Sequence, residues 1–268
     1  MTVSYREIVS GLRQLNLNPS RPVIVHASLS SFGEVRGGVE TLLGALLGSV
    51  EAVMAPSFTY KTMLIPETGP ENNGLAYGSG KDANRMAEFF RPDMPADPLM
   101  GVLPEALRKH PAARRSGHPI LSFCGVNVPA ALAAQSLAEP LAPVRVLYER
   151  DGWVLLLGVN HTVNTSIHYA EQLAGRKSFT RWALTLNGIR ECPHFPSCSL
   201  GFEAAAPLFS GITHTVQIGD ACVQALPLQA MVTRVVQYLK KDPAALLCSD
   251  AQCERCNAVR AELAGRTV

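Results

Sequence analysis

Residues 153–159 form an unbroken apolar run near the middle of the chain. A run without polar alternation is typical of a strand that is covered on both faces. The residues that follow predict a helix, because Asn164 or Thr165 can serve as its N-cap and Gly175 suits a position just past its C-terminus. This strand–turn–helix unit is the centre of the predicted fold.

Apolar patterning elsewhere predicts further strands and helices in alternation. Short apolar runs predict strands at 23–27, 52–55 and 120–126, and helical spacing predicts helices at 4–16, 37–47, 103–109, 129–136, 144–148, 226–239 and 253–263. Between 178 and 226, short pieces of alternating polarity indicate antiparallel strands. We therefore predict an α/β fold, a single large domain over residues 1–268 with a central mixed sheet flanked by helices. A β-rich C-terminal addition and a Cys-containing helical tail at 240–268 complete it.

Composition narrows the class of protein. With 47% hydrophobic and 17% charged residues, the 268-residue chain can bury a large core. A formal net charge of +2 gives no reason to expect a nucleic acid or a membrane as partner. The N-terminal residues lack a signal-peptide pattern and no apolar stretch is long enough to span a membrane, so we expect a cytoplasmic protein, monomeric or homodimeric.

Candidate chemistry is concentrated on the predicted helix after residue 163. Asn164, His168 and Glu171 are spaced so that they share one helix face. A histidine oriented by a nearby carboxylate suits a general base, although a surface His and Glu on an amphipathic helix fit the same spacing. The presence of His161 in the strand-to-helix turn favours the catalytic interpretation. The choice between His161 and His168 as the base stays open. His26 ends the predicted strand at 23–27 in a similar way.

Small hydroxyl residues follow two other predicted strands, at 28–33 and 57–59. A strand, a loop of small residues and a helix N-terminus can bind an anion, but an ordinary turn has the same composition. Another loop carries Arg114 and Arg115, which could hold phosphates or be solvated. No dinucleotide or P-loop motif is present.

Five of the seven cysteines lie in the C-terminal third, at positions 192, 198, 248, 253 and 256. The C-x4-C-x2-C spacing, with Cys198, Cys192 or His194 as a fourth ligand, is compatible with a structural zinc site. Free thiols fit equally well, so we predict no metal. Cys124 and Cys222 lie in apolar, strand-like contexts and are expected to be buried.

Four blocks of sequence, VHASLSSFG, APSFTY, MGVLPEALRKHPAARRSGHPILSF and LLLGVNHTVNTSIHYAE, resemble the aminoglycoside 3-N-acetyltransferases in the same order and at similar spacing. The resemblance covers most of residues 1–239. It implies the fold of that antibiotic N-acetyltransferase family, which is distinct from the GNAT fold. It also implies acetyl-CoA as co-substrate and direct acetyl transfer to the 3-amino group of an aminoglycoside or another polyamine.

The resemblance also implies roles for individual residues. His168 would be the base, with Glu171 orienting its ring or meeting the cationic substrate. His26 would hold the CoA thiol side or the developing oxyanion, for which Thr165 is a second candidate. The implied CoA-binding residues are Ser28, Leu29, Ser30, Ser31, Phe32, Gly33, Ser57, Phe58, Thr59, Ser116, His118 and Ser122. The implied substrate-binding residues are Tyr60, Glu67, Asp97, Asn164 and Glu171, because acidic side chains on the insertion at 61–97 suit a polycation.

Three other functions compete with this interpretation. Acetylation of a different amine uses the same chemistry and cannot be separated by sequence. A thioester hydrolase with a Ser-His-Glu set is a second, although no G-x-S-x-G motif is present. A zinc-bearing binding module without catalytic activity is the third.

Overall fold

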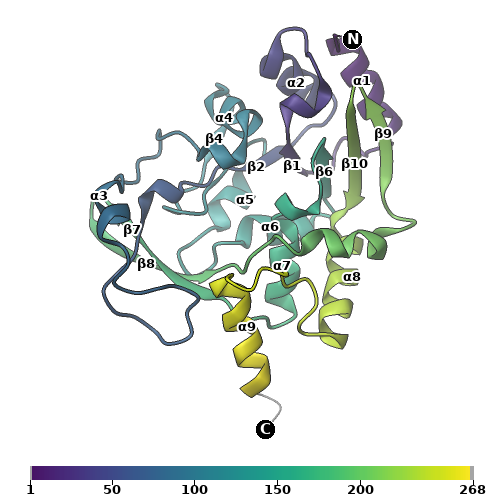
Figure 1. Ribbon diagram of the computed structural model, residues 1–268. Coiled ribbons are helices and arrows are strands. Elements are labelled where there is room, and N and C mark those ends of the chain that lie inside the picture. The colour runs from purple at the N-terminus through teal and green to yellow at the C-terminus, as the bar shows by residue number, and fades with distance from the viewer. Residues whose placement is uncertain (1, 266–268) are drawn as a thin grey trace.

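The structure, a computed structural model, describes residues 2–265 and consists of strands and helices that alternate along the chain (Figure 1). The strands are β1 (Val23–Ala27), β2 (Val53–Pro56), β3 (Met63–Leu64), β4 (Arg114–Arg115), β5 (Phe123–Val126), β6 (Trp153–Leu157), β7 (Phe179–Thr185), β8 (Gly188–Phe195), β9 (His214–Ile218) and β10 (Ala221–Pro227). The α-helices are α1 (Tyr5–Gln14), α2 (Gly38–Leu47), α3 (Lys81–Arg85), α4 (Val102–Lys109), α5 (Pro129–Ala134), α6 (Ala142–Glu149), α7 (Ser166–Leu173), α8 (Leu228–Lys241) and α9 (Glu254–Gly265).

Seven of the described strands form the main sheet, in the order β4-β5-β2-β1-β6-β10-β9. At its centre β1 pairs in parallel with both β2 and β6, whereas the outer pairings are antiparallel. The sheet is therefore mixed, as predicted. Because β1 and β6 run in parallel and in register, their carboxyl ends lie side by side at one edge of the sheet.

Helices cover both faces of this sheet and create two cores. Val23 and Val25 of β1 face one core, which includes residues of α1, α2 and α4, whereas Ile24 faces the other, which includes residues of α5, α6, α7 and α8. All five residues of β6 are buried. Burial of both faces explains why β6 is apolar without alternation.

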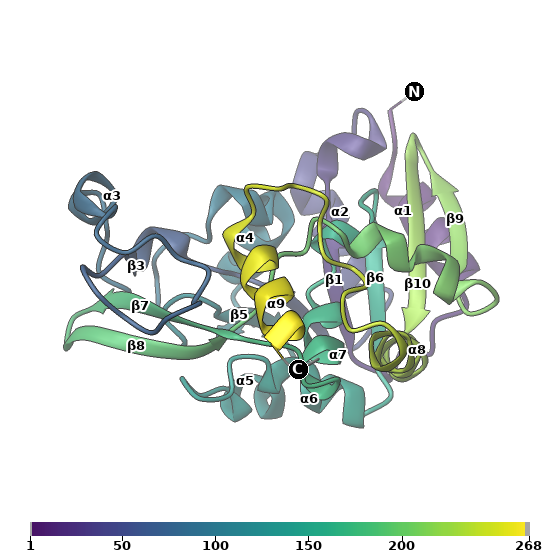
Figure 2. The same ribbon diagram turned by 60° about the horizontal axis from the view of Figure 1, so that its bottom comes forward.

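A smaller sheet of β3, β7 and β8 extends from one side of the molecule (Figure 2). The segment from 178 to 226 thus supplies β7 and β8 to the small sheet, and β9 and β10 to the main one. Helix α9 packs against the main body of the protein, because Ala258 and Val259 belong to the core that contains residues of α7 and α8. Lys177 of the loop after α7 pairs with Glu262 of α9 at 3.1 Å.

The predicted fold class is confirmed, and the differences are local. The insertion at 61–97, for which no helix or strand is predicted, contains β3 and α3. Cys222 was expected to be buried but is exposed, because it lies on the outward face of β10, while Cys124 is buried as expected. The last three residues of the predicted tail, 266–268, lie outside the described part of the chain. In residues 2–265, no helix combines the length and apolarity needed to cross a bilayer.

Gly125 of β5 generates a test of the packing between β5 and β2. A Cβ atom at this position would lie 2.3 Å from the carbonyl oxygen of Val53, which is backbone and cannot rotate away. We expect Gly125→Ala to lower the free energy of unfolding by about 2 kcal/mol, measured by urea denaturation. Gly117→Ala is the matched control, since a Cβ there meets nothing within 4 Å, and its effect should stay below about 0.5 kcal/mol. Equal midpoints for the two variants would contradict the packing described here.

Candidate active site

A cleft of about 830 Å³ opens at the sheet edge where β1 and β6 end. Its walls are built by residues 26–30 at the end of β1, the start of α4, the turn 159–165 after β6, His168 of α7 and the segment 195–200 at the end of β8. Segments far apart in the sequence therefore meet at one place. A cleft at the carboxyl ends of parallel strands is the usual ligand site of α/β folds.

His168 lines this cleft and is held by Glu171, one turn further along α7. The Nδ1–H group of His168 donates a hydrogen bond of 2.7 Å to Oε2 of Glu171. The imidazole ring also packs against Phe202, with 4.7 Å between the ring centroids. With Nδ1 engaged and 10% of the side chain accessible, Nε2 is the nitrogen left for a ligand.

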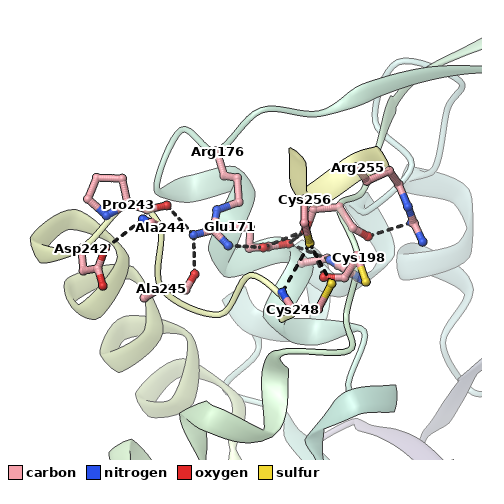
Figure 3. A network of polar contacts seen from close by, with 12 residues as sticks. Glu171, Arg176, Cys198, Asp242, Pro243, Ala244, Ala245, Cys248, Arg255 and Cys256 are labelled. Atoms are coloured by element: carbon pink, nitrogen blue, oxygen red, sulfur yellow. Dashed lines mark hydrogen bonds and ion pairs between the residues drawn. The ribbon is translucent and has the colours of Figure 1, made fainter. Parts of the chain in front are cut away.

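Glu171 is almost fully buried, and its carboxylate is surrounded by donors (Figure 3). Oε1 accepts a hydrogen bond of 2.7 Å from Arg176, and the Ser197 hydroxyl lies 2.8 Å from Oε1 and 2.7 Å from Oε2. Arg176 in turn donates to the carbonyl oxygens of Pro243 and Ala245, each at 2.6 Å. Both carboxylate oxygens are thus occupied within the protein. From this position the carboxylate can orient the His168 ring, and Glu171 does not line the cleft.

Burial alone would raise the pKa of the Glu171 carboxyl. Hydrogen bonds from His168 and Ser197 and the charges of His168 and Arg176 outweigh burial, so the pKa lies below the ordinary value of 4.5. The carboxylate is therefore ionised at neutral pH although it is shielded from water.

His26, at the end of β1, also lines the cleft. Its Nε2 atom is buried and has no hydrogen-bond partner among the described residues. Burial and the nearby His161 lower the pKa of His26 to about 3, so the ring is neutral at physiological pH. A buried, unpaired polar nitrogen at a cleft is a candidate contact for a ligand.

His161 is placed differently from His168. It does not line the cleft. Its ring is buried against Phe209, with 4.7 Å between the ring centroids, and its Nδ1 lies 3.2 Å from the side-chain nitrogen Nδ2 of Asn164. Burial lowers the pKa of His161. Of the two histidines between which the sequence could not choose, the structure presents His168 to the cleft.

The predicted CoA-binding residues fall into two groups. Ser28, Leu29, Ser30, Gly33 and Phe58 line the cleft. The other residues do not line it: they are Ser31, Phe32, Ser57, Thr59, Ser116, His118 and Ser122.

These side chains are packed or hydrogen-bonded within the protein. Ser31 donates to the carbonyl oxygen of Gly158 at 2.7 Å, and Phe32 is fully buried. Thr59 donates to Pro119 O at 2.6 Å, while Ser57 and Ser122 bond to each other's backbone carbonyl oxygens.

The block 114–123 differs most from the expectation. Nδ1 of His118 accepts from the backbone N–H groups of Ile120 and Leu121, at 3.1 and 3.0 Å, and Ser116 accepts from Phe123 N at 2.8 Å. Arg115 donates to backbone carbonyl oxygens, including that of Ser57 at 2.6 Å. Most polar groups of this block therefore pair within the protein, because the loop folds back on itself, whereas Nε2 of His118 is buried without a partner among the described residues.

The predicted substrate-binding residues are also divided. Tyr60, whose pKa burial raises to about 12, and Asn164 line the cleft. Glu67 is exposed outside the cleft lining, and Asp97 accepts a hydrogen bond from Leu99 N at 3.0 Å as the cap of a short 3-10 helix. Among the described residues that line the cleft there is no Asp or Glu, and Arg255 is the one permanently charged side chain.

Sequence reasoning missed Arg176, Ser197 and Arg255. Arg176 follows the helix-ending Gly175, a position from which its side chain returns to Glu171. Ser197 and Arg255 lie 26 and 84 residues beyond Glu171 and have no local pattern that links them to it. Their proximity to cysteines 198 and 256 is the only signal that could have drawn attention to them.

The chain matches the family model described as aminoglycoside 3-N-acetyltransferase over residues 24–240. A curated relative, aminoglycoside N(3)-acetyltransferase III from Salmonella sp, is 30% identical over 273 aligned positions, which cover 88% of this chain and 91% of the relative. Other curated relatives reach 35% identity, but the chain spans just under two thirds of their length, between 58% and 64%.

Two solved structures share the fold. The apoenzyme of aminoglycoside acetyltransferase AAC(3)-IVa has a TM-score of 0.80 at 24% identity, covering 97% of this chain and 98% of its own. AAC-IIIb in a binary complex with CoASH has a TM-score of 0.74 at 24% identity, covering 90% and 97%. These likenesses extend over nearly the whole chain and agree with the predicted fold.

The Glu171 network generates a prediction about stability and pH. Glu171→Gln leaves the buried Arg176 without its charge partner, so we expect a loss of about 3 kcal/mol in the free energy of unfolding at pH 7. Since the folded-state pKa of Glu171 is lowered, its stabilisation is complete above pH 4.5 and is lost as the pH falls through the folded-state pKa. The difference in the free energy of unfolding between wild type and variant should therefore be smaller at pH 3.5 than at pH 7, as measured by urea denaturation at the two pH values.

Glu149→Gln is the control for this measurement. Glu149 is exposed and pairs with Arg145 at 3.2 Å on the surface. Its replacement should cost less than about 1 kcal/mol. A Glu171→Gln variant as stable as this control at pH 7 would contradict the role given to the buried network.

Proposed function

Because the chain belongs to the aminoglycoside 3-N-acetyltransferase family, we propose that it transfers the acetyl group of acetyl-CoA to the 3-amino group of an aminoglycoside. The observation that carries the proposal is the His168–Glu171 pair, with His168 presented at the wall of a cleft of about 830 Å³. The family supplies the class of reaction, and the geometry supplies the residues.

His168 acts as the general base. Its Nδ1 donates to Glu171, which leaves Nε2 as a proton acceptor facing the cleft. The acceptor amine is an ammonium ion in water and can attack a carbonyl only after losing a proton. The neutral amine then forms the C–N bond with the acetyl carbon and the C–S bond of the thioester breaks. The nitrogen loses its second proton as it becomes an amide, one of the two protons ends on the sulfur so that CoA leaves as the thiol, and the other is released to solvent. Transfer is direct, without an acetylated enzyme.

The Glu171 carboxylate supports this step through its negative charge. An imidazole that accepts a proton at Nε2 becomes cationic, and a carboxylate 2.7 Å from Nδ1 stabilises that cation. Arg176 and Ser197 hold the carboxylate in place, since Arg176 donates to Oε1 and the Ser197 hydroxyl lies within hydrogen-bond distance of both oxygens. Ser197 donates to Glu171 rather than to His168, which disfavours a hydrolase in which this serine would be the nucleophile.

His26 and Thr165 are the candidates for contact with the thioester oxygen. Both line the cleft near His168, and Nε2 of His26 has no partner within the described protein. Negative charge develops on the thioester oxygen when the amine attacks, and a donor placed there lowers the barrier. A neutral ring serves as such a donor through one N–H group.

CoA occupies the side of the cleft formed by Ser28, Leu29, Ser30, Gly33 and Phe58. The first residues of α2 and α4, Gly38 and Val102, line the same cleft. The positive dipole end of each helix suits the phosphates of CoA, although the N–H group of Gly38 itself donates to Val35 O at 2.9 Å. The apolar Leu29 and Phe58 suit the pantetheine arm.

The acceptor lies on the side of Tyr60 and Asn164. The cleft lining lacks carboxylates in the part of the chain that the structure describes, so the acceptor is bound there through hydroxyl groups such as that of Tyr60, while the buried Asn164 amide bonds to His161 and Ser166. This makes an amine other than an aminoglycoside the one rival that the geometry favours. Release of free thiol from acetyl-CoA, followed with a panel of aminoglycosides and simple polyamines, distinguishes the two, and thiol release without any amine would instead indicate a hydrolase.

His168→Ala removes the base and should lower kcat by about two to four orders of magnitude, with CoA binding largely kept. Thiol release at saturating acetyl-CoA measures the first quantity and isothermal titration calorimetry the second. His194→Asn is the matched control, since His194 is exposed on β8 and Asn tolerates its left-handed backbone φ of 58°. A fully active His168→Ala enzyme would remove His168 from the mechanism.

His26→Gln tests the oxyanion contact. If His26 donates to the thioester oxygen, kcat should fall by about tenfold to a thousandfold. The shape of the kcat–pH profile between pH 6 and 9 should not change, because a group with a pKa of about 3 does not titrate there. Unchanged kinetics would exclude His26 from the site.

A further inference from the structure

Four cysteine side chains converge behind the wall of the cleft. The Sγ atoms of Cys198, Cys248, Cys253 and Cys256 all lie within 4.8 Å of one another. Cys198 follows β8, whereas the other three belong to the segment between α8 and the first turns of α9. Three of the four are buried and Cys253 is half-buried. In Figure 3 the labelled Cys198, Cys248 and Cys256 lie together, below the start of α9.

The distances match one tetrahedral ion better than disulfides. In a zinc tetrathiolate with Zn–S bonds of about 2.3 Å, neighbouring sulfur atoms lie roughly 3.8 Å apart. Sγ of Cys248 and Sγ of Cys256 are 3.4 Å apart, far beyond the roughly 2.05 Å of a disulfide. Four sulfur atoms that share one centre, rather than forming two separate pairs, are the ligand set of a closed structural zinc site.

Backbone amides point at the sulfur atoms. Leu200 N–H donates to Sγ of Cys198 at 3.5 Å, and Cys248 N–H donates to Sγ of Cys256 at 3.4 Å. Such N–H···S contacts stabilise thiolates in metal sites and fix the ligand loops. The other residues considered as fourth ligand are elsewhere: Cys192 lies against Arg190 O, and His194 lies 3.2 Å from Ser178 Oγ.

The cluster is joined directly to the candidate active site. Ser197, the neighbour of Cys198, donates to both oxygens of Glu171. Arg255, between Cys253 and Cys256, lines the cleft and donates to the carbonyl oxygen of Ser197 at 2.9 Å. The segment 195–200 is therefore held from both sides, by Glu171 and by the cysteine-rich segment.

We propose that these four cysteines bind one structural zinc ion, and that the ion fixes the wall segment 195–200 so that Ser197 holds the Glu171 carboxylate. The zinc site stands on the four thiols alone. Its effect on turnover rests on the proposed function of His168 and Glu171. Ser197 is a positioning residue in this proposal, because its hydroxyl is bonded to Glu171 and acts through that carboxylate.

The metal content of the purified protein tests whether the four cysteines bind zinc. Protein purified without added metal should contain about one zinc per chain by inductively coupled plasma mass spectrometry, and Cys198→Ser and Cys253→Ser should lose most of it. Cys222→Ser is the control, because Cys222 is exposed outside the cluster, and should keep one zinc. If the serine variants do not fold, cobalt exchanged into the wild-type protein should show the absorption bands of a tetrahedral thiolate site. Wild-type protein with no zinc, with iron, or with disulfides among these cysteines would overturn the proposal.

The turnover number tests whether Ser197 positions the Glu171 carboxylate. Ser197→Ala keeps all four thiols, so it should retain one zinc per chain while kcat falls about tenfold and the KM for acetyl-CoA stays unchanged. Ser197→Thr, which keeps the hydroxyl, should recover part of the loss. A zinc-replete Ser197→Ala enzyme with the wild-type kcat would overturn the positioning role. Should no amine be acetylated by the wild type, the proposed function fails and the zinc measurement still stands.

Discussion

The buried carboxylate of Glu171 is the interaction on which the candidate site depends. An ionised group shielded from water is stable only when its hydrogen-bonding capacity is met, and here Arg176, Ser197 and His168 meet it. His168 lies on α7, Arg176 lies just after this helix, and Ser197 lies just after β8. Removing the carboxylate would leave a buried guanidinium without its charge partner and an imidazole without its orienting acceptor, so stability and chemistry share one group.

The sheet explains why this group lies where it does. Helix α7 follows β6 after a short turn, so its first residues stand at the carboxyl end of the sheet, beside the end of β1. His168 and His26 therefore face one cleft although they are 142 residues apart in the sequence. Cores on both faces of the sheet hold these strand ends in place.

The cysteine-rich segment completes the same wall from the outside. Arg176 reaches past Glu171 to the carbonyl oxygens of Pro243 and Ala245, just before the cysteines begin, and Arg255 returns to Ser197 O. Two arginines thus tie the segment after α8 to the region around Glu171 through main-chain oxygens. A metal tetrathiolate at this point would give a small, loop-rich region the rigidity that its few apolar residues cannot supply.

The sequence alone determined the features that depend on local spacing: the buried strand β6, the helix after it, and the pairing of His168 with Glu171, because residues three apart on a helix are neighbours. The family resemblance drawn from four short blocks is confirmed by the match over residues 24–240. Only the tertiary structure decided that Ser197 joins Glu171, that Cys198 rather than Cys192 completes the sulfur cluster, and that the hydroxyl and histidine groups of residues 116–122 turn inward. These outcomes depend on how distant segments pack, and no periodicity in the chain encodes such contacts.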